Sequence, residues 1–89
     1  MPYINKELRV AKDEHIDSLS KLIDTADELN YTITKRCHIW IKLHGLNYFT
    51  INSVVGVLEC AKLELYRMIA ASYENNKRLT NGSVSELDH

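Results

Sequence analysis

The sequence predicts an all-α fold: a small three-helix domain with a long C-terminal helix and a polar tail. The chain has 89 residues, 45% of them hydrophobic and 26% charged, with one proline and three glycines. This length allows one modest core, and so few turn-forming residues disfavour an all-β protein. Apolar residues recur at three- and four-residue steps, as in amphipathic helices. We expect a single helical domain over residues 1–75 and a polar C-terminal tail over residues 76–89.

The first helix is expected over residues 6–28, with an apolar stripe on one side and charges on the other. The apolar positions include Leu8, Ala11, Ile16, Leu19, Leu22, Ile23 and Ala26. The charged side carries both Asp and Lys residues. It is therefore interpreted as a solvated surface in preference to a metal cluster.

The second helix is expected over residues 33–44. The segment LNYTIT interrupts the first pattern, and Thr32 has the chemistry of an N-cap. Gly45 is placed to end the helix as a left-handed residue, with Leu46 closing an apolar contact behind it.

The third helix is expected over residues 51–75, and it has apolar residues on two sides. One face holds Val54, Leu58, Ala61, Leu65, Met68, Ile69 and Ser72, and the other holds Gly56, Cys60 and Leu63. A glycine inside a helix costs about 1 kcal/mol relative to alanine, so Gly56 suggests that another backbone approaches closely there. A helix that needs cover on two sides predicts a homo-oligomer formed through helices. The alternative is a monomer in which the first two helices sandwich the third.

The C-terminal segment ENNKRLTNGSVSELDH is polar and contains the turn signal Asn81-Gly82. A short hairpin would require Leu79 and Val84 to pair across this turn. A tail that becomes ordered on a neighbouring subunit is a further alternative.

The residues that carry chemistry do not form a catalytic or metal-binding pattern. Cys37 and His38 are adjacent, so on a helix they point about 100° apart and cannot share a metal ion as i, i+4 ligands do. Glu59 and Glu64 are also on different sides of their helix, which excludes a paired-carboxylate site built from them alone. The glycines are isolated, so no phosphate loop is present. We expect no enzyme activity, no cofactor and no metal.

The cellular location is expected to be cytoplasmic. Only two cysteines are present, too few for a disulfide framework. The N-terminus MPYINKELRV lacks the apolar core of a signal peptide, and no apolar run is long enough to span a membrane.

A basic cluster marks the second expected helix, where Lys35 and Arg36 are adjacent. The net charge of −1 argues against duplex nucleic acid as a partner, because duplex binding in so small a domain usually requires a basic excess. A compact phosphorylated ligand needs only a local cluster. The alternative interpretation is a solvated helix face.

Several segments of the chain resemble a small family of proteins of unknown activity from tailed-phage and prophage genomes. The resemblance rests on MPYI, LNYTIT, NYFTINSVVGVLECAKLELYR and the closing ASYE and NGSV, with GVLECAKLELYR the most specific. Ser72 and Ser83 depart from the family pattern, which has proline and aspartate there. This departure leaves the end of the third helix less sharply defined.

The resemblance implies a small, non-enzymatic phage protein, and such proteins are often counter-defence factors of the host cell cytoplasm. One such class acts as a sponge that holds cyclic nucleotide or cyclic ADP-ribose signals between subunits. The residues expected to bind this ligand are Lys35, Arg36, Lys62, Tyr66, Arg67 and Tyr73. The basic residues would bind phosphate and the tyrosines would stack on a base. The alternative interpretation of these residues is structural: the basic residues form ion pairs with neighbouring glutamates, and the tyrosines pack at the rim. The alternative function is a protein-binding inhibitor or adaptor acting on a host defence or phage protein.

Overall fold

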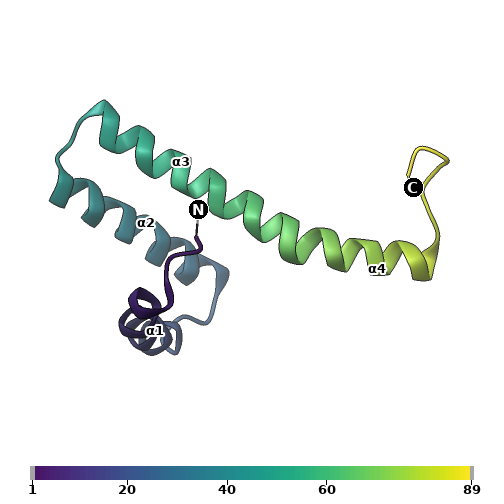
Figure 1. The fold of residues 1–89 in the computed structure, drawn as a ribbon, viewed down its shortest axis with the longest axis horizontal. Coiled ribbons are helices and arrows are strands. Elements are labelled where there is room, and N and C mark those ends of the chain that lie inside the picture. Colours follow the sequence, from purple (N-terminus) through teal and green to yellow (C-terminus); the bar gives the residue numbers. More distant parts are fainter. Residues whose placement is uncertain (1, 89) are drawn as a thin grey trace. The chain divides into compact units, whose positions relative to one another are not determined.

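The computed structural model describes residues 2–88, and this part of the chain is all-α, as predicted (Figure 1). The helices are α1 (Lys6–Ser20), α2 (Ala26–His44), α3 (Tyr48–Leu65), the π-helical turn η1 (Tyr66–Ala70) and α4 (Ala71–Asn81). No strand occurs among the described residues. The chain divides into two compact units, Met1–Val57 and Leu58–His89, and each is described by itself.

Helix α1 begins at a side-chain cap and ends earlier than the sequence pattern predicts. Asn5 caps it, accepting a hydrogen bond from the Leu8 backbone at 3.0 Å. The helix ends at Ser20, and two tight turns follow, in which Leu22 N–H donates to Leu19 at 2.9 Å and Ile23 N–H to Ser20 at 3.2 Å. The predicted helix over residues 6–28 is therefore wrong beyond Ser20, because apolar periodicity alone does not locate a cap.

Helix α2 begins at Thr25, which forms a capping box with Glu28. The Thr25 hydroxyl accepts from Glu28 N–H at 3.1 Å, and the Glu28 carboxylate accepts from Thr25 N–H at 3.0 Å. These reciprocal bonds satisfy two backbone donors that a helix start leaves open. The prediction that Thr32 is the N-cap is wrong, because Thr32 lies inside α2 and donates to the Glu28 carbonyl at 2.9 Å.

The one buried residue of the described chain, Thr50, lies in the first turn of α3 and bonds to the loop that follows α2. Gly45 ends α2, as predicted, but with φ 102° and ψ 141° it is not in the left-handed helical conformation. Leu46 is 81% exposed, so the expected apolar contact is absent. Thr50 is 4% exposed, and its N–H donates to Asn47 Oδ1 at 3.0 Å. This N-cap bond explains why α3 begins at Tyr48, earlier than residue 51.

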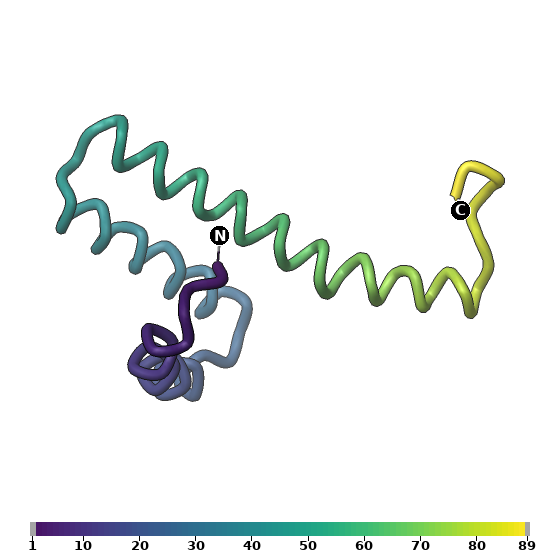
Figure 2. Tube along the Cα trace, viewed as in Figure 1, coloured from purple at the N-terminus to yellow at the C-terminus, as the bar shows by residue number. Residues whose placement is uncertain are grey.

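In the second unit, helical backbone continues through η1 into α4 as far as Asn81 (Figure 2). This end lies beyond residue 75, where the sequence pattern places the end of the third helix. Gly82, at φ 89°, ends the helix, and its N–H donates to the Arg78 carbonyl at 2.8 Å. Because Leu79 belongs to α4, it does not pair with Val84 in a hairpin. The non-helical tail therefore begins at Gly82.

The hydrophobic side chains that the structure describes are all at least partly exposed in both units. Among residues 2–88 no hydrophobic residue is buried, although Ile23, Cys37, Ile41 and Val54 are half-buried. Helices in proteins gain most of their stability from packing an apolar face against another element. Both units therefore present apolar helix faces that require cover.

Candidate functional site

The six predicted ligand-binding residues fall in both units, and all are exposed. Lys35 and Arg36 lie in α2, Lys62 in α3, Tyr66 and Arg67 in η1, and Tyr73 in α4. No single unit assembles all six. Within the second unit, each of the other four contacts a charged neighbour: Lys62 with Glu59, Tyr66 with Glu74, Tyr73 with Lys77 and Arg67 with Glu64.

The first of these pairs joins Lys62 and Glu59, with Lys62 Nζ 3.4 Å from Glu59 Oε1. Tyr66 follows one turn after Lys62, and its hydroxyl lies 3.4 Å from Glu74 Oε2, a long hydrogen bond. Three residues later Lys77 Nζ lies over the Tyr73 ring, 5.6 Å from its centroid. We call the set Glu59, Lys62, Tyr66, Glu74 and Lys77 the tyrosine flank. The flank alternates carboxylates and ammonium groups along one side of the helix.

The π-helical turn η1 determines which residues share this flank. Ala71 N–H donates to the Tyr66 carbonyl, a bond across five residues, whereas an α-helix bonds across four. The turn therefore holds an extra residue. Two α-helical turns span about seven residues, but the bond from Tyr66 to Glu74 shows that eight residues span two turns here.

The same eight-residue step redirects the apolar side of the helix. It links Leu65 to Tyr73, and the seven-residue step before it links Leu58 to Leu65. Ala61 and Ile69 lie between them, at three- and four-residue steps. We call Leu58, Ala61, Leu65, Ile69 and Tyr73 the apolar face, and all five are exposed.

The predicted apolar face differs from this one after η1. Ser72 is seven residues after Leu65, one residue short of two turns across the π-helical turn. Ser72 is therefore rotated away from the face by about one residue step, roughly 100°, and Met68 begins the same rotation within η1. The predicted face includes Met68 and Ser72 and omits Tyr73 because a straight α-helix returns to the same side after about seven residues.

Arg67 is held by an acidic neighbour on another side of the helix. Its Nη2 donates to Glu64 Oε1 at 2.8 Å and to Oε2 at 3.1 Å. Residues three apart on a helix form such pairs readily. An anionic ligand at Arg67 would therefore have to compete with the Glu64 carboxylate.

Helix α2 carries an aromatic stack beside the predicted basic cluster. The Trp40 and His44 rings are stacked, with centroids 4.1 Å apart and planes at 20°. Arg36 is four residues before Trp40, one turn away on the same side of the helix. We call Arg36, Trp40 and His44 the stacked platform. His44 is not among the residues predicted to bind a ligand, although the i, i+4, i+8 spacing of Arg36, Trp40 and His44 is a signal for this platform.

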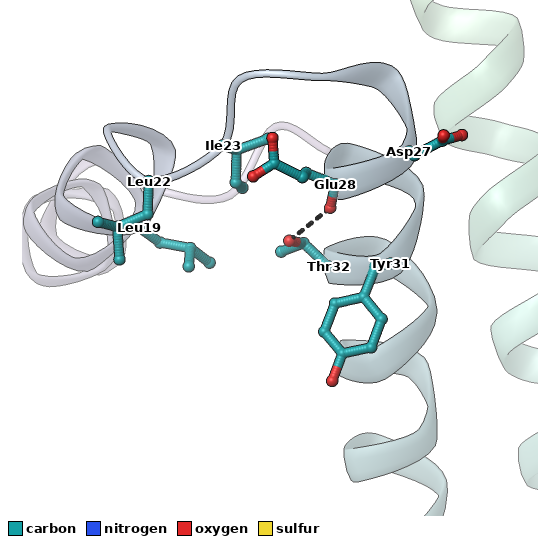
Figure 3. Close-up of a pocket in the computed structure, with 7 residues that line it drawn as sticks. All are labelled: Leu19, Leu22, Ile23, Asp27, Glu28, Tyr31 and Thr32. Atoms are coloured by element: carbon teal, nitrogen blue, oxygen red, sulfur yellow. Dashed lines mark hydrogen bonds between the residues drawn. The ribbon is translucent and has the colours of Figure 1, made fainter.

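A shallow groove of about 380 Å³ lies between the end of α1 and the start of α2 in the first unit (Figure 3). Its lining is Leu19, Leu22, Ile23, Asp27, Glu28, Tyr31 and Thr32. The backbone and hydroxyl bonds from Thr25, together with the Asp24 backbone, keep the pKa of the Glu28 carboxyl below its ordinary value. An apolar floor with a carboxylate at its edge is suited to an apolar or basic partner and disfavours an anion.

Comparison with known proteins places the chain in a family. Residues 1–84 match the model of a domain of unknown function, DUF6899. The chain belongs to the DUF6899 family. No curated protein and no solved structure matches it. The family description carries no activity, so the resemblance to phage proteins remains a prediction for this DUF6899 chain.

The described part of the DUF6899 chain offers surfaces and not an enclosed site. Within residues 2–88, no three His, Cys, Asp or Glu side chains are grouped as a metal ion would require. None of the helices over these residues combines the length and apolar character that crossing a bilayer requires. The arrangement can stack an aromatic ring, pair with an anion and bury apolar helix faces against a second molecule.

Proposed function

We propose that this protein is a non-enzymatic binding protein that works as a homo-oligomer and holds a nucleotide-derived signal where subunits meet. The observation that carries the proposal is that no hydrophobic side chain among residues 2–88 is buried in either unit. A chain of this size gains its stability from a hydrophobic core. Association would supply that core, and a pocket between subunits would enclose a ligand that one chain cannot enclose. In a phage setting, such a protein would act in the host cytoplasm as a counter-defence sponge.

The stacked platform supports the ligand class. A nucleobase stacks on aromatic faces, and a guanidinium binds phosphate oxygens in pairs. Arg36, with Lys35 beside it, supplies the cations, and Trp40 supplies a large aromatic ring that His44 already stacks upon. Cyclic dinucleotides and cyclic ADP-ribose have both groups that this platform would bind.

The second-unit residues are proposed in a supporting role. Tyr66 and Tyr73 would stack on the ligand, and Lys62 and Arg67 would neutralise phosphate. Lys62 and Arg67 already pair with carboxylates, at 3.4 Å and 2.8 Å. A phosphate must therefore displace or share these partners, which makes Arg36 the stronger candidate for an anchor. Duplex DNA is not proposed, since the chain has a net charge of −1.

Thermal unfolding with added nucleotide tests the proposal. A ligand at a hundredfold excess over its Kd stabilises the folded state by about 2.7 kcal/mol, so a cyclic dinucleotide or cyclic ADP-ribose should raise Tm. Arg36→Ala and Trp40→Ala should each abolish the rise. Lys12→Ala, an exposed charge removed from α1, is the matched control and should retain it. If none of these nucleotides raises the Tm of the unmodified protein, the nucleotide proposal fails.

The groove in Figure 3 favours a second candidate, a protein-binding inhibitor or adaptor. Leu19, Leu22 and Ile23 form an apolar surface in the groove against which a side chain of a host defence or phage protein would pack. Leu22→Asp would place a charge on that surface and should abolish capture of the partner from a host lysate. Leu43→Asp, at an exposed leucine of α2 that does not line the groove, should not. Equal capture by the two variants would exclude the groove as the contact.

A further inference from the structure

We infer that the helix of the second unit pairs in antiparallel orientation with the same helix of a second copy, through the apolar face and the tyrosine flank. The inference rests on the oligomer in the proposed function and goes further, because it names the surface, the orientation and the register. It uses only residues of the unit Leu58–His89.

Residues 58–88 contain no other helix, so nothing else within the described second unit can cover the apolar face. Leu58, Leu65, Ile69 and Tyr73 are 41%, 59%, 62% and 61% exposed. In proteins most of the stability of a helix comes from packing an apolar stripe against another element. The stripe advances by seven residues and then by eight, so the π-helical turn keeps it continuous along the helix.

The charges of the tyrosine flank indicate which partner fits. In chain order the flank runs acidic Glu59, basic Lys62, Tyr66, acidic Glu74 and basic Lys77. Glu59 and Lys62 are three residues apart, as are Glu74 and Lys77. Reversing the order therefore exchanges each acidic position for a basic one at the same spacing. The tyrosine flank is therefore complementary in charge to the same flank on an antiparallel second copy of the helix.

An antiparallel pair places this flank against itself. With one register, Lys62 faces Glu74 of the partner subunit, and Glu59 faces Lys77 of the partner subunit. The two-fold symmetry of a homodimer repeats both pairs, so four inter-subunit ion pairs form. In a parallel pair the two-fold axis runs along the helices, so the flanks of the two copies lie on opposite edges of the interface and cannot pair with each other. Pairing of the flank with itself therefore requires the antiparallel dimer.

The apolar face fits the same orientation. The steps from Ala61 to Leu65 and from Ile69 to Tyr73 are both four residues, so reversal places Leu65 against Ile69 of the partner subunit. It also places Ala61 against Tyr73 of the partner subunit. A small residue opposite a large one is how packed helices fill space evenly. The alignment that best matches the apolar residues differs by two residues from the one that best matches the charge pairs. This offset is about 3 Å along the helix axis, which long charged side chains can span.

Zero-length cross-linking tests this pairing on the unmodified protein. A carbodiimide joins a lysine to a carboxylate in direct contact. In a 1:1 mixture of ¹⁴N- and ¹⁵N-labelled protein, cross-links between chains carry mixed isotopes in about half of the products. We expect a mixed-isotope link between Lys62 and Glu74. These residues are twelve apart in one helix, about 18 Å, so a contact within one chain cannot produce the link. Mixed-isotope links that join only other segments would overturn the pairing, as would their complete absence.

Two leucine variants test the face itself. Leu65→Asp places a charge in the interface and should weaken self-association by at least about tenfold. Leu63→Asp changes the same residue type two positions away, off the apolar face and similarly exposed, and should change it less than about threefold. Equal effects of the two variants would contradict the assignment of the face.

A charge-exchange experiment keeps the pairing testable even if the leucine variants fail to fold. Lys62→Glu should weaken the dimer and Glu74→Lys should weaken it too, while the double variant should recover most of the affinity. No recovery would contradict the antiparallel register. A nucleotide-dependent Tm rise without the Lys62–Glu74 link would leave the proposed function intact and remove this inference. The Lys62–Glu74 link without any nucleotide effect would leave this inference intact and remove the nucleotide proposal.

Discussion

Tyr66 and Glu74 are eight residues apart in sequence, yet the Tyr66 hydroxyl lies 3.4 Å from the Glu74 carboxylate on the same side of one helix. In an uninterrupted α-helix, residues eight apart are about 80° from alignment. The π-helical turn Tyr66–Ala70 absorbs the extra residue and brings the two side chains into line. The same turn directs Tyr73 to the apolar face. One local change in helix winding therefore decides which surface the second unit presents.

Deletion of Met68 should convert the π-helical turn into an ordinary α-helical turn. Leu65 and Tyr73 would then be seven residues apart in an α-helix, about two turns, so the apolar face would stay in phase. We expect an unchanged helix content by far-UV circular dichroism and an unchanged self-association by sedimentation. Deletion of Leu63 is the contrasting variant, because it removes a residue from α-helical winding, rotates the residues after it by about 100° relative to Leu58 and Ala61, and should weaken association. Association that is weaker after deletion of Met68 than after deletion of Leu63 would contradict the role of the turn as a compensated extra residue.

Thr25→Ala should destabilise the first unit by about 1 kcal/mol, because it removes the side chain that accepts the Glu28 N–H bond at the start of α2. Thr32→Ala is the matched control, since Thr32 lies inside the helix and only donates to the Glu28 carbonyl. Its cost should stay below about 0.5 kcal/mol. Urea unfolding measures both. A larger loss for Thr32→Ala would contradict the placement of the helix start.

The capping box should also make stability depend on pH. Hydrogen bonds from the Thr25 backbone, the Thr25 hydroxyl and the Asp24 backbone lower the pKa of Glu28 in the folded protein. A lowered folded-state pKa stabilises the protein fully above the ordinary glutamate pKa, about 4.3, and this contribution is lost as pH falls through the lower folded value. Urea midpoints measured between pH 3 and 7 should therefore fall less steeply on the acid side for Glu28→Gln, which keeps the box without a titrating group. Identical profiles for both proteins would contradict this role.

Two glycines should respond in opposite ways to alanine. Gly45 has φ 102°, which strains any residue with a Cβ, so Gly45→Ala should destabilise by about 1 kcal/mol. A Cβ added at Gly56 meets no atom within 4 Å in the described chain, so Gly56→Ala should stabilise the isolated helix by about 0.5–1 kcal/mol. If Gly56→Ala instead weakens self-association in sedimentation, another chain approaches that glycine closely, as the sequence suggested.

The helical class and the stop at Gly45 were predictable because they depend on composition and on local backbone demands. The start of α2 was also encoded, since Thr25 and Glu28 have the spacing of a capping box. That signal was missed because the apolar periodicity of the first segment continues through it. Thr32 looked equally suitable as a cap, and only the observed bonds distinguish the two threonines.

The winding of the second unit could not be predicted in the same way. A π-helical turn depends on which backbone bond forms at Ala71, and no residue type in Tyr66–Ala70 requires it. The side of the helix on which each predicted site residue lies depends on this winding. Lys62 and Tyr66 do lie on one flank, but Arg67 pairs with Glu64 on another side. The Trp40–His44 stack depends on side-chain rotamers, which the i, i+4 spacing permits without determining.

Native mass spectrometry of the protein purified from bacterial cells tests the central claim most directly, namely that association completes a core which neither unit has alone. We predict a homo-oligomer, with a nucleotide-sized adduct that denaturation releases for identification. A monomer at micromolar concentration would contradict the account, because exposed apolar faces would then persist without a second copy to cover them.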